Sequence, residues 1–157
     1  MKPNRITIVD DDREALLLLR CMLGRLYPAC DISMFPKARD ALVQVLARGT
    51  DIVITNHATG PMSGVDLIRK LRARHSLLPI IMLSGNPAVE SAAVAAGATV
   101  FIDKNSDPEE IAAHLRALVE LLDGRAPRRA PKPSSRLVAR PQLNPKHRLG
   151  PTRTLRV

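Results

Sequence analysis

Residues 6–20 read ITIVDDDREALLLLR and contain the two patterns that decide the fold. A short apolar run at 6–9 ends in three consecutive aspartates, and a segment with leucines at helical spacing comes next. An almost continuously apolar run of this kind is typical of a parallel strand that is buried on both faces. The stretch therefore predicts a buried strand, an acidic loop and an amphipathic helix.

The same unit recurs along the chain. Apolar strands are predicted at residues 6–9, 32–35, 52–55, 80–83 and 99–102, each followed by a helical pattern. The second of these runs alternates apolar and polar residues, which indicates an edge strand. Five alternating strands and helices predict an α/β fold, a (βα)₅ doubly wound parallel sheet with the flavodoxin-like strand order 2-1-3-4-5.

The charge divides the chain into two parts. The formal net charge of the 157 residues is +9, but residues 1–123 hold all 15 acidic residues and carry −1, whereas residues 124–157 hold ten basic residues and no acidic one. Six of the 13 prolines also lie in this last part. We expect a folded domain at 1–123 and a basic Pro/Arg-rich tail at 124–157 that is disordered and whose candidate partners are acidic proteins or nucleic acid.

The composition excludes several classes of protein. Two cysteines are too few for a disulfide scaffold, and no apolar run approaches the ~20 residues of a membrane span. No signal peptide is expected, since the first apolar run ends in aspartates. A cytoplasmic protein is therefore expected, with no membrane contact. Cys21 on an apolar helix face and Cys30 at a strand start are both predicted to be buried thiols.

Topology alone predicts where a ligand binds. In open α/β sheets the site lies at the carboxyl ends of the strands where the strand order reverses, here the first and third strands. The polar residues that come after the strands at this edge are Asp10, Asp11, Asp12, Asn56, His57, Ser84 and Lys104. Clustered carboxylates suit Mg²⁺, and a hydroxyl and an ammonium suit phosphoryl oxygens. The plainer alternative stays open: a helix cap at Asp12, a loop serine and a solvated lysine. Thr59 and Ser63 are further hydroxyls near this pocket, and Ser63 is expected to cap the third helix.

Longer segments resemble the receiver domain of two-component response regulators over residues 4 to about 122. The opening ITIVDDDREALLLLR is similar to the family's first strand, acidic pair and first helix. DIVITNHATGPMSGVDLIRKLR at 51–72 resembles its phosphoacceptor strand, loop and third helix. LPIIMLSGNP at 78–87 and AAVAAGATVFIDKNSDPEEI at 92–111 resemble its fourth strand, its fifth strand and the start of its final helix. The order and spacing of these matches make the resemblance specific.

The resemblance implies a role for six residues. It places the Mg²⁺-binding acidic pair at Asp10 and Asp11, the phosphoacceptor at Asn56, the hydroxyl switch at Ser84, the aromatic switch at Phe101 and the phosphoryl-binding lysine at Lys104. The family has aspartate where this chain has Asn56. An amide cannot form an acyl phosphate, and a metal site of Asp10, Asp11 and Asn56 has one negative charge fewer, so Mg²⁺ is expected to be weakly bound or absent.

Other positions also depart from the family. Gly60 and Pro61 are transposed relative to its usual loop, and Asn105 stands where a cis-proline is common, so a trans bond after Lys104 is expected. These departures favour a degenerate receiver. Whether Asn56 is natural, engineered or converted to aspartate by deamidation stays open.

The main hypothesis is a single-domain, non-enzymatic receiver without an attached effector in a two-component phosphorelay. It would act through protein–protein contacts without phosphorylation at Asn56. Its expected partners are a sensor histidine kinase or another signalling protein, and a second copy through the helices at 88–96 and 108–122.

Two other functions are weighed. One is nucleic-acid binding by the tail. The other is a phosphatase resembling the haloacid dehalogenases, which Asp10 and Asp12 superficially fit. That family needs a further acidic motif after the lysine, and the segment 105–123 offers only its capped helix start, Glu120 and Asp123.

Overall fold

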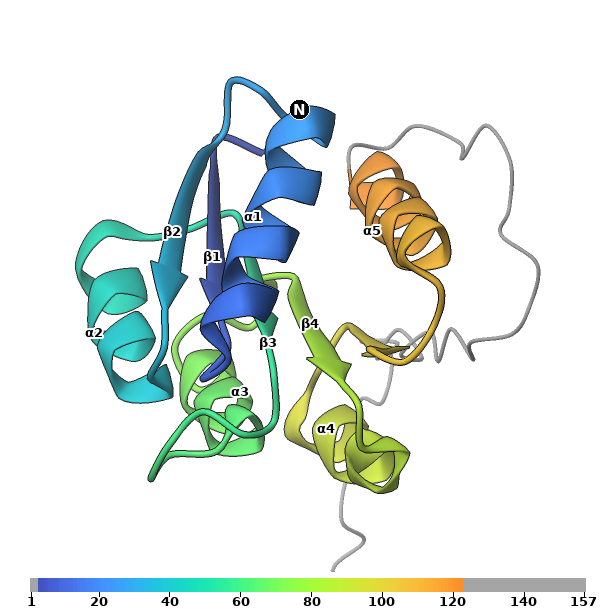
Figure 1. Ribbon diagram of the computed structural model, residues 1–157. Helices are drawn as coiled ribbons and strands as arrows, with labels where there is room; N and C mark the ends of the chain where they lie inside the picture. The colour runs from blue at the N-terminus through green and yellow to red at the C-terminus, as the bar shows by residue number, and fades with distance from the viewer. Residues whose placement is uncertain (1–2, 123–157) are drawn as a thin grey trace, which may run out of the picture.

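The computed structural model describes residues 3–122, and within them five strands alternate with five α-helices (Figure 1). The strands are β1 (Arg5–Val9), β2 (Asp31–Phe35), β3 (Ile52–Thr55), β4 (Ile80–Ser84) and β5 (Val100–Asp103). The helices are α1 (Arg13–Leu26), α2 (Ala38–Arg48), α3 (Gly64–Arg72), α4 (Glu90–Ala96) and α5 (Pro108–Leu122), with a 3₁₀ turn, η1 (Pro87–Val89), before α4. The predicted tail 124–157 and its boundary lie outside the described residues.

All strand pairs are parallel, and the order is β2-β1-β3-β4-β5. The predicted fold and strand order are confirmed, as is the edge position of β2. Strand β1 pairs with β2 on one side and β3 on the other. The strand order therefore reverses at the boundary between β1 and β3, although all the strands remain parallel. The carboxyl ends of β1, β3, β4 and β5 therefore lie together at one edge of the sheet.

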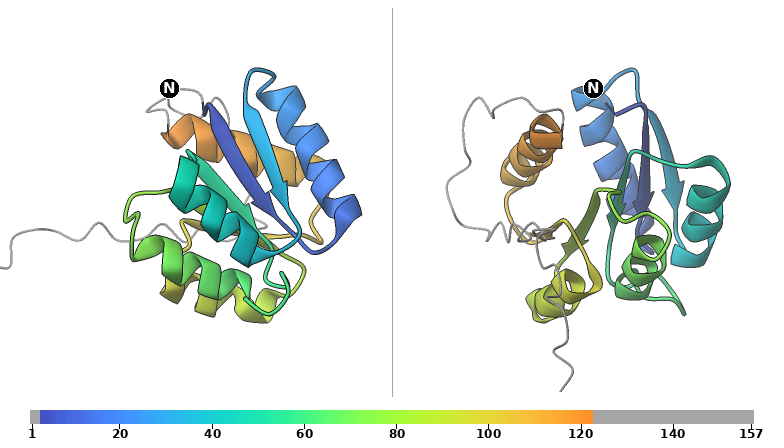
Figure 2. Two further views of the ribbon diagram at one scale, coloured as in Figure 1. Left: turned by 90° about the vertical axis from the view of Figure 1, so that its left-hand side faces the viewer. Right: turned by 180° about the vertical axis from the view of Figure 1, so that it is seen from behind.

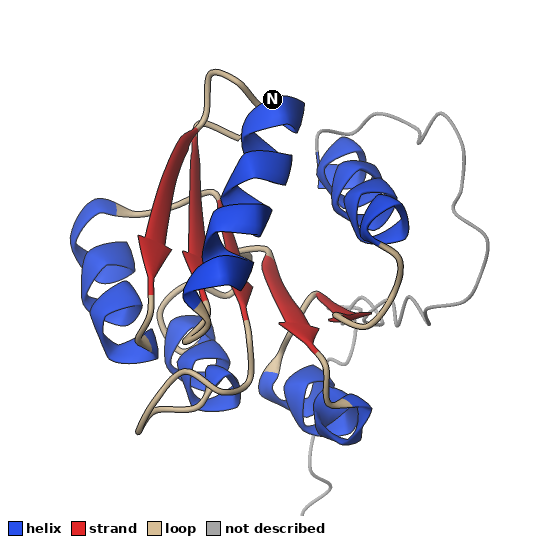
Figure 3. Ribbon diagram, viewed as in Figure 1, coloured by secondary structure: helices blue, strands red, loops and turns tan. Residues whose placement is uncertain are grey.

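Helices cover both faces of the sheet, as Figures 2 and 3 show. On one face, α1 and α5 share a hydrophobic cluster with side chains from β1, β3, β4 and β5. On the other face, α2, α3 and α4 pack on a second cluster, which includes the fully buried Leu67, Ile68 and Leu71 of α3. Helices on both faces explain why the central strands are almost continuously apolar. None of the described helices is both long enough and apolar enough to cross a membrane.

Side chains predicted as helix caps occupy those positions. The Asp12 carboxylate accepts hydrogen bonds from the backbone N–H groups of Glu14 and Ala15 at 2.8 and 3.3 Å, which caps α1. The Ser63 hydroxyl accepts one from the N–H of Asp66 at 3.1 Å and caps α3. Both caps satisfy backbone donors that have no partner within the helix. They also fix where the loops at the carboxyl edge end.

The Arg72 side chain joins three segments on the opposite edge. Its guanidinium donates to the carbonyl oxygens of Gly97 at 2.8 Å and Leu78 at 2.5 Å, and to the Thr99 hydroxyl at 3.2 Å. The end of α3 is thereby tied to the starts of β4 and β5. Gly97 adopts φ +105°, and a Cβ there would lie 2.8 Å from Arg72 Cγ, so both backbone and packing require glycine.

Replacing this guanidinium is expected to destabilise the domain. Arg72→Met leaves partly buried carbonyl oxygens without a donor, and the free energy of unfolding should fall by about 2–4 kcal/mol in urea denaturation. Arg69→Met on the same helix is the matched control. Within the described part of the chain, the Arg69 side chain pairs only with Asp66, in an exposed ion pair, so its loss should cost less than about 1 kcal/mol. Equal losses for the two variants would contradict the assigned role.

The two cysteines differ from the prediction that both are buried. Cys21 is exposed on α1, and Cys30 is partly buried before β2. The prediction for Cys21 is wrong because the helix buries the opposite side, that of Leu16, Leu19 and Leu23. Burial, with the nearby carboxylates of Asp51 and Asp31, raises the pKa of the Cys30 thiol to about 11.

Alkylation should therefore distinguish the thiols. A rise in pKa from 9.0 to about 11 leaves Cys30 with about 100-fold less thiolate near neutral pH, and the thiolate is the reactive form. Iodoacetamide at pH 8 should modify Cys21 well before Cys30, as followed by peptide mass spectrometry. In urea the preference should disappear. Faster modification of Cys30 in the folded protein would contradict the structure.

Candidate functional site

A buried carboxylate, Asp10, lies at the centre of the polar edge. Asp10 follows β1 and is 4% exposed. Its Oδ1 accepts hydrogen bonds from the Asn56 side-chain amide at 3.2 Å and from the backbone N–H of Asp12 at 3.0 Å. Its Oδ2 accepts one from the Lys104 ammonium at 2.6 Å. One carboxylate thus joins the ends of β1, β3 and β5.

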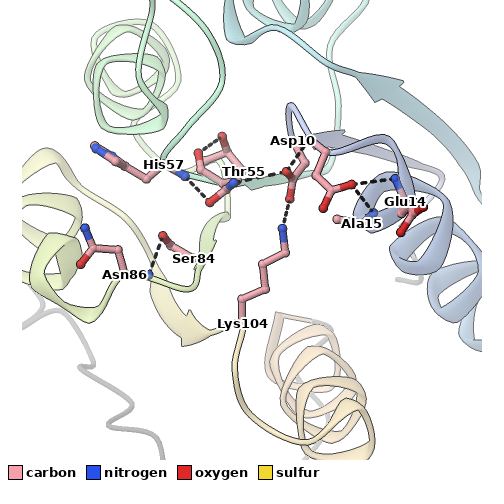
Figure 4. Close-up of polar contacts among 10 residues, drawn as sticks. Asp10, Glu14, Ala15, Thr55, His57, Ser84, Asn86 and Lys104 are labelled. Carbon is pink, nitrogen blue, oxygen red and sulfur yellow. Dashed lines mark hydrogen bonds and ion pairs between the residues drawn. The ribbon is translucent and has the colours of Figure 1, made fainter.

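The Lys104 and Asp10 side chains point toward one another across the edge (Figure 4). The lysine side chain is 29% exposed and the aspartate side chain 6%, so the ion pair is largely shielded from water. Two opposite charges in such surroundings attract each other more strongly than on the surface. Removing one of them leaves the other buried without a partner, which destabilises the fold. The backbone N–H of Lys104 also donates to the Ser84 carbonyl at 3.1 Å, which holds the lysine loop beside β4.

The Asn56 amide is oriented by two neighbours. Its NH₂ group faces the Asp10 carboxylate, and its oxygen accepts the backbone N–H of His57 at 2.7 Å. A carboxylate at this position has no donor to offer Asp10, and two adjacent negative charges repel each other. With asparagine, the pocket is instead a neutral set of one carboxylate, one ammonium and one amide.

Gly64 sets how closely α3 approaches this pocket. Its N–H donates to the His57 carbonyl at 2.9 Å, and a Cβ at this position would lie 1.9 Å from the Asn56 carbonyl oxygen. Only glycine permits this contact between backbones. In the sequence it appears only as part of the loop pattern, and nothing local identifies it as a packing requirement.

The two predicted switch residues are buried beside the pocket. Ser84 ends β4, is 2% exposed and accepts a hydrogen bond from the backbone N–H of Asn86 at 3.3 Å. Figure 4 shows no dashed line from Ser84 to Asp10 or Lys104. Phe101 on β5 is 6% exposed and packs in the cluster beneath α3 and α4.

Three other candidates do not join the Asp10 cluster. Asp11 is exposed. The His57 ring points away from Asp10 in Figure 4, and its buried Nδ1 atom has no hydrogen-bond partner among residues 3–122. The Thr59 hydroxyl, predicted to lie near the pocket, donates to the Met62 carbonyl at 2.8 Å and so stabilises its own loop.

Asn105 forms a link that sequence reasoning missed. The bond after Lys104 is trans, as predicted. The Asn105 amide donates to the Gly85 carbonyl at 3.0 Å, and its backbone N–H donates to the Asp103 carboxylate at 2.9 Å. The loops after β4 and β5 are thereby tied together. A polar side chain in place of the family's proline was the available signal.

The donor set suits Mg²⁺ only in part. Two carboxylates, Asp10 and Asp11, and the Asn56 amide oxygen are oxygen ligands of the kind Mg²⁺ prefers. Within residues 3–122, however, no three His, Cys, Asp or Glu side chains gather as a metal cluster. Both Asp10 oxygens also have donors already, one of them the Lys104 ammonium. A cation at this place would have to displace them.

Comparison with known proteins agrees with this geometry. Residues 6–116 match the family model of the response regulator receiver domain. This chain belongs to the response regulator receiver family.

Curated relatives are longer than this receiver domain. The response regulator MprA of Mycolicibacterium vanbaalenii is 30% identical over 119 residues, which are 74% of this chain and 51% of that protein. The cyclic di-GMP phosphodiesterase response regulator RpfG of Xanthomonas campestris is 30% identical over 120 residues, 74% of this chain and 32% of that protein. The chain spans about a third to a half of these relatives.

Solved receiver domains share the fold. The beryllofluoride-activated N-terminal receiver domain of RstA from Klebsiella pneumoniae is 25% identical with a TM-score of 0.66, covering 74% of this chain and 98% of that one. The signal receiver domain of an HD-domain protein from Pseudomonas fluorescens has a TM-score of 0.69 at 23% identity, covering 80% of this chain and all of that one.

The ion pair in this receiver gives a direct test. Lys104→Met leaves the buried Asp10 charge without its cation, so the free energy of unfolding should fall by about 1–3 kcal/mol. Millimolar Mg²⁺ should restore part of this loss, because the metal takes the place of the ammonium beside Asp10. Urea denaturation with and without Mg²⁺ measures both effects.

The same substitution at an exposed position serves as control. Lys70→Met on α3 should change stability by less than about 0.5 kcal/mol and should show no response to Mg²⁺. If Lys104→Met were as harmless as Lys70→Met, the ion pair would have no part in holding the pocket together.

Proposed function

We propose that this receiver domain acts in two-component signalling through protein–protein contacts, without aspartyl phosphorylation at position 56. The observation that carries the proposal is the Asn56 amide, which donates to Asp10 from the place where the family has its phosphoacceptor. Formation of an acyl phosphate requires a carboxylate oxygen to attack phosphorus. A neutral amide has no such nucleophile.

The remaining pocket supports this proposal. In the family, the acidic pair, the hydroxyl and the lysine act around a phosphorylated aspartate. Here the Lys104 ammonium donates to the Asp10 carboxylate at 2.6 Å, and the Ser84 hydroxyl oxygen accepts a hydrogen bond from the backbone N–H of Asn86. These contacts hold both groups in place without a phosphoryl group. The domain then keeps one conformation, and the same binding surface, until a partner protein alters it.

Mg²⁺ has a reduced role in this proposal. Asp10, Asp11 and Asn56 are the residues that would hold it, and bound Mg²⁺ would neutralise charge on phosphoryl oxygens. Their set carries one negative charge fewer than that of a receiver with aspartate at position 56, and Lys104 competes for Asp10. We therefore propose that Mg²⁺ binds weakly or not at all.

The partners are proposed from the family and the sequence. A sensor histidine kinase or another signalling protein is the expected partner, in the cytoplasm. The helices α4 and α5 correspond to the surface proposed for homodimers and outputs. The basic residues 124–157 suit an acidic protein or nucleic acid. Each is a separate proposal.

The domain is proposed to be non-enzymatic. Asp103, just before Lys104, and Asp107, three residues after it, accept backbone hydrogen bonds from Asn105 and Glu109. These contacts assign them to loop and helix capping, so they do not supply the further acidic motif of a phosphatase. RpfG is named as a phosphodiesterase, but the chain covers only 32% of it.

Beryllofluoride tests the proposal, because it mimics an acyl phosphate only on a carboxylate. With Mg²⁺ and beryllofluoride, the amide NMR signals of Ser84, Phe101 and Lys104 should not shift in the full chain. In Asn56→Asp they should shift, and acetyl phosphate should add the mass of one phosphoryl group. The double variant Asn56→Asp, Lys104→Met is the control with an acceptor but no phosphoryl-binding lysine, and its response should be weaker.

A response in the unsubstituted chain would contradict the proposal. Peptide mass spectrometry would then identify whether another residue carries the group or whether residue 56 has become aspartate. A silent Asn56→Asp variant that is folded by circular dichroism would show that more than the acceptor has been lost.

A further inference from the structure

The solvent-facing side of α1 has an apolar centre. Leu17 is 50% exposed and Leu18 58% exposed, and the exposed Cys21 lies one turn further along the helix. At 100° per residue these three side chains lie opposite the leucines that α1 contributes to the core. Figure 1 shows α1 in front of the sheet, with α5 beside it and no described helix over its outer side. We call Glu14, Leu17, Leu18, Cys21 and Arg25 the outer face of α1.

Among the described helices, neighbouring large hydrophobic side chains are exposed on α1 and on α2. Among the side chains that the structure describes, the other large hydrophobic ones that are exposed are Val43 and Leu46 on α2 and Leu77 in a loop. None of them is on α4. Single exposed hydrophobics need no explanation, but neighbouring ones in the middle of a solvent-facing helix side indicate a contact surface.

The charges at its two ends are opposite. Glu14 lies four residues before Leu18, and Arg25 lies four residues after Cys21, so these four residues form one stripe along the helix. If a second α1 packs antiparallel on this stripe, Glu14 of each copy meets Arg25 of the other, and Leu18 meets Cys21. The stripe is complementary to itself about a two-fold axis, which is the form of interface that homodimers use.

Gly24 borders the same face. Glycine inside a helix is unfavourable, and nothing in the described chain lies within 4 Å of the Cβ that an alanine would place here. Packing within the domain therefore does not require glycine at this position. A missing side chain does allow a neighbouring helix to approach closely.

We infer that the outer face of α1 is a contact surface for a second copy of this chain, packed antiparallel through Glu14, Leu18, Cys21 and Arg25. A single helix pair is a small interface, below the roughly 1,200 Å² of stable complexes, so the dimer forms only at elevated concentration. The inference does not depend on position 56, and it differs from the α4–α5 surface proposed above.

Charge exchange provides the decisive experiment. Sedimentation equilibrium of the full chain between about 1 μM and about 1 mM should show a monomer–dimer equilibrium that weakens at high salt. Glu14→Arg and Arg25→Glu should each weaken dimerisation about tenfold or more, and the double variant should restore it. Leu18→Glu should abolish it. Val43→Glu, which makes the same kind of change at a similarly exposed position on α2, should leave it unchanged.

Gly24→Ala separates dimerisation from folding. The added methyl group favours the helix, so the variant should melt at a higher temperature, yet it should dimerise less because the helices cannot approach as closely. If the variant lost the dimer because it unfolded, its melting temperature and its dimerisation would both fall.

Cross-linking locates the contact. Helices pack 8–10 Å apart, so the two Cys21 thiols, close to the two-fold axis, should be joined by a short bis-maleimide. The control carries Val43→Cys on the exposed side of α2 in a Cys21→Ser background, and it should remain uncrosslinked at the same concentration.

Three results would overturn the inference. The first is a chain that stays monomeric over the whole range. The second is a dimer that cross-links through Val43→Cys and not through Cys21. The third is a dimer that is insensitive to Glu14→Arg and Arg25→Glu but lost when residues 123–157 are deleted. Asn56→Asp should not alter dimerisation of the unphosphorylated chain, so failure here leaves the proposed function untouched.

Discussion

The buried charge of Asp10 is the constraint on which the pocket depends. A carboxylate that is 4% exposed must be neutralised and hydrogen-bonded to remain stable in the fold. Three groups from different parts of the chain do this: the Lys104 ammonium, the Asn56 amide and the backbone N–H of Asp12. Each of these contacts fixes the end of a strand or the start of a helix. The hydrogen bonds of one carboxylate therefore position three loops.

The sheet makes this arrangement possible. Parallel strands place all their carboxyl ends at one edge, and the order β2-β1-β3-β4-β5 puts β1 and β3 side by side. Residues 94 positions apart along the chain, Asp10 and Lys104, then form an ion pair. The lysine loop reaches Asp10 because the Asn105 amide and the Lys104 N–H hold it against the end of β4.

Much of the fold could be predicted because its signals are local. Each strand is marked in the sequence by apolar residues that alternate with polar ones or follow one another. Asp12 and Ser63 mark the starts of helices because their side chains suit capping positions. The polar edge could be predicted from topology. The Gly64 contact, the Asn105–Gly85 bond and the direction of the His57 ring could not be predicted, since each depends on a three-dimensional approach that has no local pattern. Cys21 was misplaced because α1 also has apolar residues, Leu17 and Leu18, on its solvent-facing side, and Cys21 lies with them and not with the buried leucines.

The position of α1 has a mechanical consequence. The helix begins three residues after Asp10, and its cap residue, Asp12, is also a hydrogen-bond donor to Asp10. Fourteen helical residues form a rod about 21 Å long. Because a helix is stiff along its axis, a sliding or tilting of the rod at its Leu26 end is delivered to the Asp12 N–H at the other. A contact at the opposite edge of the sheet, where α1 ends, can therefore alter the pocket without a ligand in the pocket.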